Sequence, residues 1–167
     1  MLNIIIAIVV LLVYTLAMIK VAGKIPPSLS DSVFFLDKSK RWIWTIVLMA
    51  VCFLCVPTII EKSSENTQFL AFLAIGGLAF VGAAPLVKFK DDPMQFKVHE
   101  YGAIVCAACS QLLLVFNCPW LLLAWIPYFA VFTWKTMGAG QNWKSWRTMI
   151  FWGEAVCFAT TFAYCLI

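Results

Sequence analysis

Long apolar runs separated by short polar segments dominate the chain. Six of these runs predict helices that cross a membrane, and they extend over residues 2–22, 42–60, 67–87, 98–116, 119–135 and 148–166. Crossing the hydrocarbon core of a bilayer takes about 20 mostly apolar residues in a helix. Because the connecting segments are short, consecutive helices should run antiparallel. The pattern therefore predicts an all-α fold, a polytopic integral membrane bundle of six transmembrane helices, in a single domain over 1–167.

Composition indicates that lipid surrounds most of the chain. Hydrophobic residues make up 63% and charged residues 12% of the 167 positions, and the mean hydropathy is +0.94. A soluble domain of this size could not bury so much apolar surface. The first run lacks the basic segment and the cleavage site of a signal peptide, which favours a retained helix. We therefore expect membrane lipids as partners.

Lysine and arginine predict the orientation, because loops rich in these residues stay in the cytoplasm. Eleven of the 12 basic residues lie in or beside the loops 23–41, 88–97 and 136–147, and Lys62 is the exception. The sequence thus predicts a multi-pass protein of the cell membrane, with these three loops cytoplasmic and both termini outside. The basic residues are spread over several loops and form no single basic face, so we expect no nucleic-acid partner.

Small residues are concentrated in the third run. Gly76, Gly77 and Gly82, together with neighbouring alanines, create a face with almost no side chains. Such a face allows membrane helices to approach closely. We expect these glycines to pack the third helix against neighbouring helices or, alternatively, against a second copy of the chain in a homo-oligomer.

Glu154 is the most informative ionisable residue, because it lies inside the sixth run. A carboxylate at that depth needs a partner or must take up a proton. The single histidine, His99, and its neighbour Glu100 begin the fourth run, which starts from the same side of the membrane. We therefore predict a cytoplasm-facing polar cavity around these three residues. Four loop residues could close it: Ser30, Asp31, Asp91 and Asp92.

Each of these polar residues also has a purely structural interpretation. Ser30 and Asp31 could cap a short helix at the membrane surface, and His99 could cap the fourth helix. Glu154 could serve only in a hydrogen bond between helices. For Gln111, inside the fourth run, we expect interhelical hydrogen bonds and no ligand.

Cysteine spacing gives no metal site. Cys52 and Cys55, and likewise Cys106 and Cys109, have the spacing of paired zinc ligands, but both pairs lie in apolar runs without the usual tight turns. We therefore expect no metal and no other cofactor. The total of 7 cysteines is odd and indicates no disulfide framework.

Two short motifs resemble a known superfamily of six-span membrane proteins. Pro27-Ser28-Leu29-Ser30 is similar to its Pro-x-x-Ser motif, and His99-Glu100-Tyr101-Gly102-Ala103 is similar to its His-x-x-Gly-Ala motif. The superfamily comprises the damage-regulated autophagy modulators, the FGF-receptor-activating proteins and uncharacterised bacterial relatives. The resemblance implies a membrane role around lipids and lipid-anchor remodelling, without a catalytic mechanism. It also implies that the Pro-x-x-Ser loop lies outside, whereas the basic residues predict a cytoplasmic loop.

Three classes of function stay open at this point. The leading hypothesis is that the polar cavity binds or transports a small ion, a proton or a lipid headgroup. An intramembrane enzyme that modifies lipid is the first alternative, with Asp31, His99 and another acid sharing acid–base work. We lean against catalysis, because the sequence contains no HExxH, GxSxG or nucleotide-binding loop. An oligomeric structural or pore-forming protein is the second alternative.

Overall fold

The computed structural model describes residues 1–85, 87–88, 90–138 and 143–167, with the side chains of 143–148 excepted. The chain is 86% helical, and no strand occurs within these ranges. The prediction of an all-α fold is thus confirmed for the described residues. The α-helices are α1 (Leu2–Ala22), α2 (Trp42–Lys62), α3 (Gln68–Ala83), α4 (Pro93–Asn117), α5 (Trp125–Gly138) and α6 (Trp143–Leu166). Short 3-10 helices are η1 (Ser30–Phe35), η2 (Lys38–Lys40), η3 (Glu65–Thr67) and η4 (Pro119–Ala124).

Among the described residues, five helical stretches are long and apolar enough to cross a membrane. They are Leu2–Ala22, Lys38–Lys62, Glu65–Ala83, Pro93–Asn117 and Met149–Leu166. They correspond to the first four predicted runs and to the sixth. The predicted fifth run, 119–135, is divided between η4 and α5, and α5 has only 14 residues.

The local sequence explains where α1 ends and where α4 begins. α1 ends at Gly23, whose φ of 64° and ψ of 11° are left-handed, a conformation that glycine adopts without steric cost. At the start of α4, the side chain of Asp92 accepts a hydrogen bond of 2.9 Å from the backbone N–H of Gln95. Pro93 occupies the first turn, where its missing N–H is not needed.

The α3 and α4 backbones meet at a pair of glycines. A Cβ added to Gly77 would lie 2.6 Å from the carbonyl oxygen of Gly102 and 2.6 Å from the backbone nitrogen of Cys106. A Cβ on Gly102 would lie 2.9 Å from the carbonyl oxygen of Gly77. The two helices can therefore approach this closely only because both positions lack a side chain.

The other two glycines of α3 differ from each other. A Cβ on Gly82 would lie 3.0 Å from the Cβ of Leu48 in α2, so this glycine also stands at a helix contact. A Cβ on Gly76 would meet nothing within 4 Å. Neighbouring residues in a helix point about 100° apart, so Gly76 and Gly77 cannot face the same partner. Packing against the described residues thus involves Gly77 and Gly82, whereas Gly76 faces open space within the single chain.

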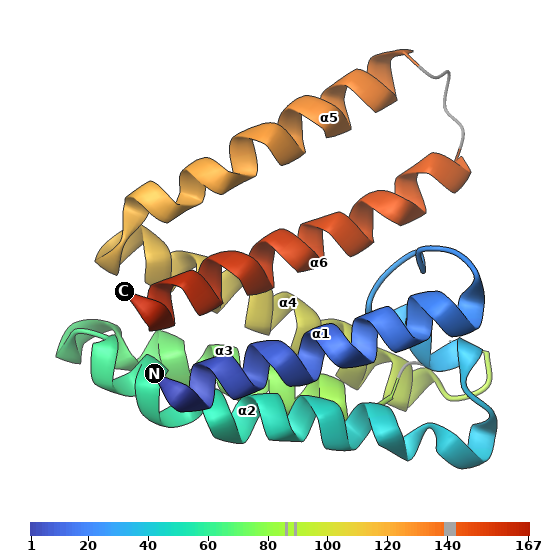
Figure 1. Ribbon diagram of the computed structural model, residues 1–167, viewed down its shortest axis with the longest axis horizontal. Coiled ribbons are helices and arrows are strands. Elements are labelled where there is room, and N and C mark those ends of the chain that lie inside the picture. Colours follow the sequence, from blue (N-terminus) through green and yellow to red (C-terminus); the bar gives the residue numbers. More distant parts are fainter. Residues whose placement is uncertain (86, 89, 139–142) are drawn as a thin grey trace.

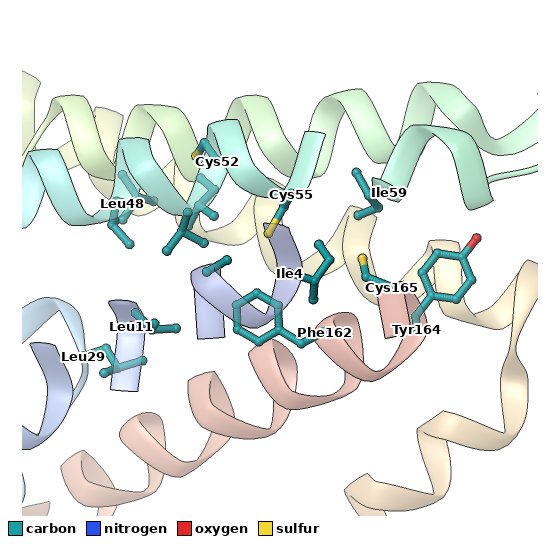
Figure 2. Packing of buried hydrophobic residues seen from close by; sticks show 14 of the residues in the cluster. Ile4, Leu11, Leu29, Leu48, Cys52, Cys55, Ile59, Phe162, Tyr164 and Cys165 are labelled. Atoms are coloured by element: carbon teal, nitrogen blue, oxygen red, sulfur yellow. The ribbon is translucent and has the colours of Figure 1, made fainter. Parts of the chain in front are cut away.

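Helices α1, α2 and α6 converge on a common apolar core. Figure 2 shows Ile4 and Leu11 of α1, Ile59 of α2, and Phe162 and Cys165 of α6 in this cluster. α5 lies at the edge of the bundle beside α6, and both chain termini lie at the same end of the molecule (Figure 1). One set of large side chains on α5 is exposed and another set is half-buried. The exposed ones are Ile126, Phe129, Val131, Trp134 and Met137, and the half-buried ones are Trp125, Tyr128 and Phe132.

Candidate functional site

The loop after α1 is attached to α6 by two hydrogen bonds. The backbone N–H of Phe151, within α6, donates to the carbonyl oxygen of Pro27 at 3.0 Å. The backbone N–H of Leu29 donates to Oε2 of Glu154 at 2.5 Å. Pro27 and Leu29 belong to the Pro-x-x-Ser segment. The backbone of that segment therefore supplies a hydrogen-bond donor to the carboxyl group of Glu154 in α6.

Hydroxyl groups hold this loop in place. Oγ of Ser28 accepts a hydrogen bond of 2.8 Å from the backbone N–H of Asp31. Serine side chains often make such local hydrogen bonds to the backbone in turns. Oγ of Ser32 donates to the carbonyl oxygen of Leu29 at 2.5 Å. The oxygen of Ser32 also lies 2.8 Å from the phenol oxygen of Tyr14 in α1, and both groups are buried. The loop is thus tied to α1 on one side and to α6 on the other.

His99 is buried at 4% exposure near the start of α4. Its Nδ1 lies 2.7 Å from the carbonyl oxygen of Ala84. A carbonyl only accepts hydrogen bonds, so Nδ1 carries the proton and the neutral ring has its lone pair on Nε2. Asp31 interacts electrostatically with both His99 and Glu154. Asp31 is thus a charged neighbour of each of these two residues.

The remaining predicted site residues separate into two groups. Ser30 is buried and lines the same cavity as Glu154. Glu100 and Asp91 are exposed, and Asp92 is used as the N-cap of α4. Glu100 follows the buried His99 directly, and a helix turns about 100° per residue, so the two side chains leave α4 in different directions.

A cavity of about 370 Å³ lies between the helices. Ser30 and Glu154 line its end beside the α1–α2 loop, and most of its wall is apolar, with contributions from α2, α3, α4, α5 and α6. His99 is not part of the wall. The volume falls within the range of small-molecule sites, which are mostly apolar pockets with a few well-placed polar groups.

A second polar cluster joins α4 to α5 and α6. Nε1–H of Trp125 donates to Oε1 of Gln111 at 2.8 Å, and Oγ1 of Thr160 lies 3.3 Å from the same oxygen. Nε2 of Gln111 lies 3.3 Å from the Sγ of Cys157. The prediction of interhelical hydrogen bonds for Gln111 is confirmed. The roles of Trp125 and Tyr14 were not anticipated, although each is a polar-tipped ring within an apolar run.

Within the described part of the chain, no group of three or more His, Cys, Asp or Glu side chains could hold a metal ion. The cysteines are free thiols. No protein-family model matches the chain, and the comparisons with curated proteins and with solved structures gave no match. The resemblance to the autophagy-modulator superfamily therefore stays a prediction.

Proposed function

We propose that the chain crosses the membrane six times, with η4 and α5 together forming the fifth crossing. The two elements cover roughly 30 Å at the rises of 3-10 and α-helices, about the thickness of the hydrocarbon core. An even number of crossings agrees with the two termini at one end of the molecule (Figure 1). The distribution of lysine and arginine favours a cytoplasmic α1–α2 loop and both termini outside.

We propose that the protein binds a lipid-like amphiphile inside the bundle, with its apolar part in the cavity and its headgroup at Glu154 and Ser30. The observation that carries the proposal is the distribution of polarity along the wall: a carboxyl group and a hydroxyl at the loop end, and mostly apolar side chains beyond them. A path for a hydrated ion would need polar groups along its whole length. Lipid binding is therefore favoured over ion or proton transport.

The two motifs give further support to a relation with the six-span superfamily. The Pro-x-x-Ser segment provides the backbone donor to Glu154 through Leu29. The His-x-x-Gly-Ala segment provides His99 for the bond to Ala84, Gly102 for the contact with α3, and Ala103 for the cavity wall. We propose on this basis that both motifs serve the same lipid site.

The proposal is tested by filling the cavity. Ala103 lines it, whereas Ala108 lies exposed on the same helix. We expect native mass spectrometry of the wild-type protein, purified in mild detergent, to reveal one retained lipid-like molecule. Ala103→Phe should abolish this adduct and Ala108→Phe should keep it. Equal adducts in the two variants, or none in the wild type, would contradict the proposal.

Lipid modification is the second candidate, and the tautomer of His99 favours it. With Nδ1 donating to Ala84, Nε2 of a neutral ring is left as the basic nitrogen, and Asp31 interacts electrostatically with His99; general acid–base chemistry can use such a pair. Incubation of the protein in liposomes of an ester-linked and an amide-linked lipid, followed by mass analysis, tests this candidate. Products that appear with the wild type and not with His99→Gln would place catalysis above simple binding.

A further inference from the structure

We propose that the occupant of the cavity is a single-chain amphiphile with a primary ammonium headgroup, which pairs with Glu154 and donates to Ser30. This inference rests on the proposed function and specifies its ligand class. Three features of the cavity support it: the charges at the headgroup end, the dimensions of the cavity and the hydrogen-bonding capacity of Glu154 and Ser30.

The charges at the headgroup end favour a cation. Glu154 accepts one backbone N–H, from Leu29, and its charged neighbour is another acid, Asp31. No lysine or arginine whose side chain the structure describes forms an ion pair with Glu154; the ion pair in the α1–α2 loop joins Lys40 and Asp37 on the surface. A carboxyl group inside a bundle ionises most readily beside an opposite charge, which an ammonium headgroup would supply to Glu154 and a carboxylate or phosphate headgroup would not.

The cavity has the dimensions of one hydrocarbon chain. Its wall on α2 extends from Trp44 to Ile59, about 22 Å at 1.5 Å per residue. Spread over a length near 20 Å, the volume of about 370 Å³ leaves a channel roughly 5 Å across. Packed carbon atoms lie about 4 Å apart, so a second chain beside the first would not fit. A two-chain phospholipid is therefore a poor match.

The polar groups at the loop end suit a headgroup that carries N–H donors. Glu154 and Ser30 both offer oxygen acceptors, and Ser30 is buried. A primary ammonium group has three donors, whereas a quaternary ammonium group has the charge and none. Charge-assisted hydrogen bonds are the stronger kind, so the primary amine should bind more tightly than its trimethylated analogue.

The inference is tested by direct binding of defined amphiphiles. Full-length protein in nanodiscs of uncharged phosphatidylcholine is titrated at pH 7 with tetradecylamine, trimethyltetradecylammonium, tetradecanol and myristate, and empty nanodiscs are subtracted. We expect tetradecylamine to bind at least about tenfold more tightly than tetradecanol, as one charge-assisted hydrogen bond implies. The affinity for trimethyltetradecylammonium should lie between these two, and myristate should bind most weakly.

Glu154→Gln gives the matching test on the protein. It should reduce the affinity for tetradecylamine to that for tetradecanol, and leave tetradecanol binding unchanged, which also shows that the variant is folded. Should the variant fail to fold, the order of the four ligands on the wild-type protein decides the question. Equal binding of amine and alcohol, or preferred binding of myristate, would overturn the ammonium assignment and leave the lipid site standing. Absence of binding by all four, with no effect of Ala103→Phe on any adduct, would refute the proposed function itself.

Discussion

Helices α3 and α5 illustrate two ways of packing within one bundle. α3 meets α4 backbone to backbone at Gly77 and Gly102, where no side chain fits. α5 stands at the edge (Figure 1), and the indole N–H of Trp125 links its first residue to α4. Both regions border the cavity, since Ala103, next to Gly102, and Trp125 line its wall. Close packing on one side and loose packing on the other leave room for a ligand between them.

The glycine contact should be the most sensitive point of the fold. Gly77→Ala places a Cβ against backbone atoms that can move only with their helix, so we expect a loss of about 2–3 kcal/mol in the free energy of unfolding. Reversible unfolding in mixed micelles, followed by circular dichroism, measures it. Gly76→Ala, one position away and open, should not lower stability and should raise it slightly, because alanine favours a helix more than glycine does. Similar losses in the two variants would show that the contact is not as close as described.

The polar cluster at Gln111 should come next. Gln111→Leu leaves the indole N–H of Trp125 without its acceptor, and we expect a loss of about 1–2 kcal/mol. Trp125→Phe removes the other partner, and the two losses should not add in the double variant. Fully additive losses would mean that this hydrogen bond does not hold α5 to α4.

A smaller effect is expected for the phenol that holds the α1–α2 loop. Tyr14→Phe removes the contact with Ser32, whose hydroxyl still donates to Leu29, so about 0.5–1 kcal/mol should be lost. Tyr101→Phe is the control, because Tyr101 is 61% exposed. Proteolysis of the loop should become faster in the first variant only. Unchanged proteolysis in Tyr14→Phe would show that another contact fixes the loop.

The smallest effect is expected on the outer face of α5. Trp134 is 74% exposed whereas Trp44 is 2% exposed, so Trp134→Ala should cost less than about 0.5 kcal/mol and Trp44→Ala about 3 kcal/mol or more. Thermal denaturation of the two purified variants compares them. A large loss for Trp134→Ala would mean that this face of α5 packs against a partner, for example a second copy of the chain.

The fold was largely predictable because its signal is carried by composition. Runs of apolar residues of membrane-crossing length predict helices regardless of their neighbours, and five of the six are long enough in the structure. The fifth run was predicted as one helix. Pro119 and the residues after it form the 3-10 helix η4 instead, so this run is divided. Periodicity alone does not reveal such a division.

The site was only partly predictable. Depth along the helices predicted a grouping of Glu154 with His99; in the structure Glu154 lines the cavity and His99 does not, while Asp31 interacts electrostatically with each of them. The sequence could not show that Glu100 is exposed, because this outcome depends on the rotation of α4. The capping role of Asp92 was readable, since Asp followed by Pro93 is typical of a helix N-terminus. It also could not indicate the backbone N–H of Leu29 as the partner of Glu154. Every residue except proline carries a backbone N–H, so the residue type at position 29 gives no signal for this hydrogen bond.

Photo-crosslinking tests the central claim, that an amphiphile lies with its headgroup at Glu154 and its chain along the cavity, most directly. Tetradecylamine with a diazirine at the end of its chain would be bound to the wild-type protein, irradiated, and mapped by peptide mass spectrometry. The account predicts labels near Ile59 and Phe162, at the end of the cavity wall away from the loop, and their loss when unlabelled tetradecylamine competes. Labels confined to exposed residues of α5 such as Ile126 and Phe129, unaffected by competition, would contradict it.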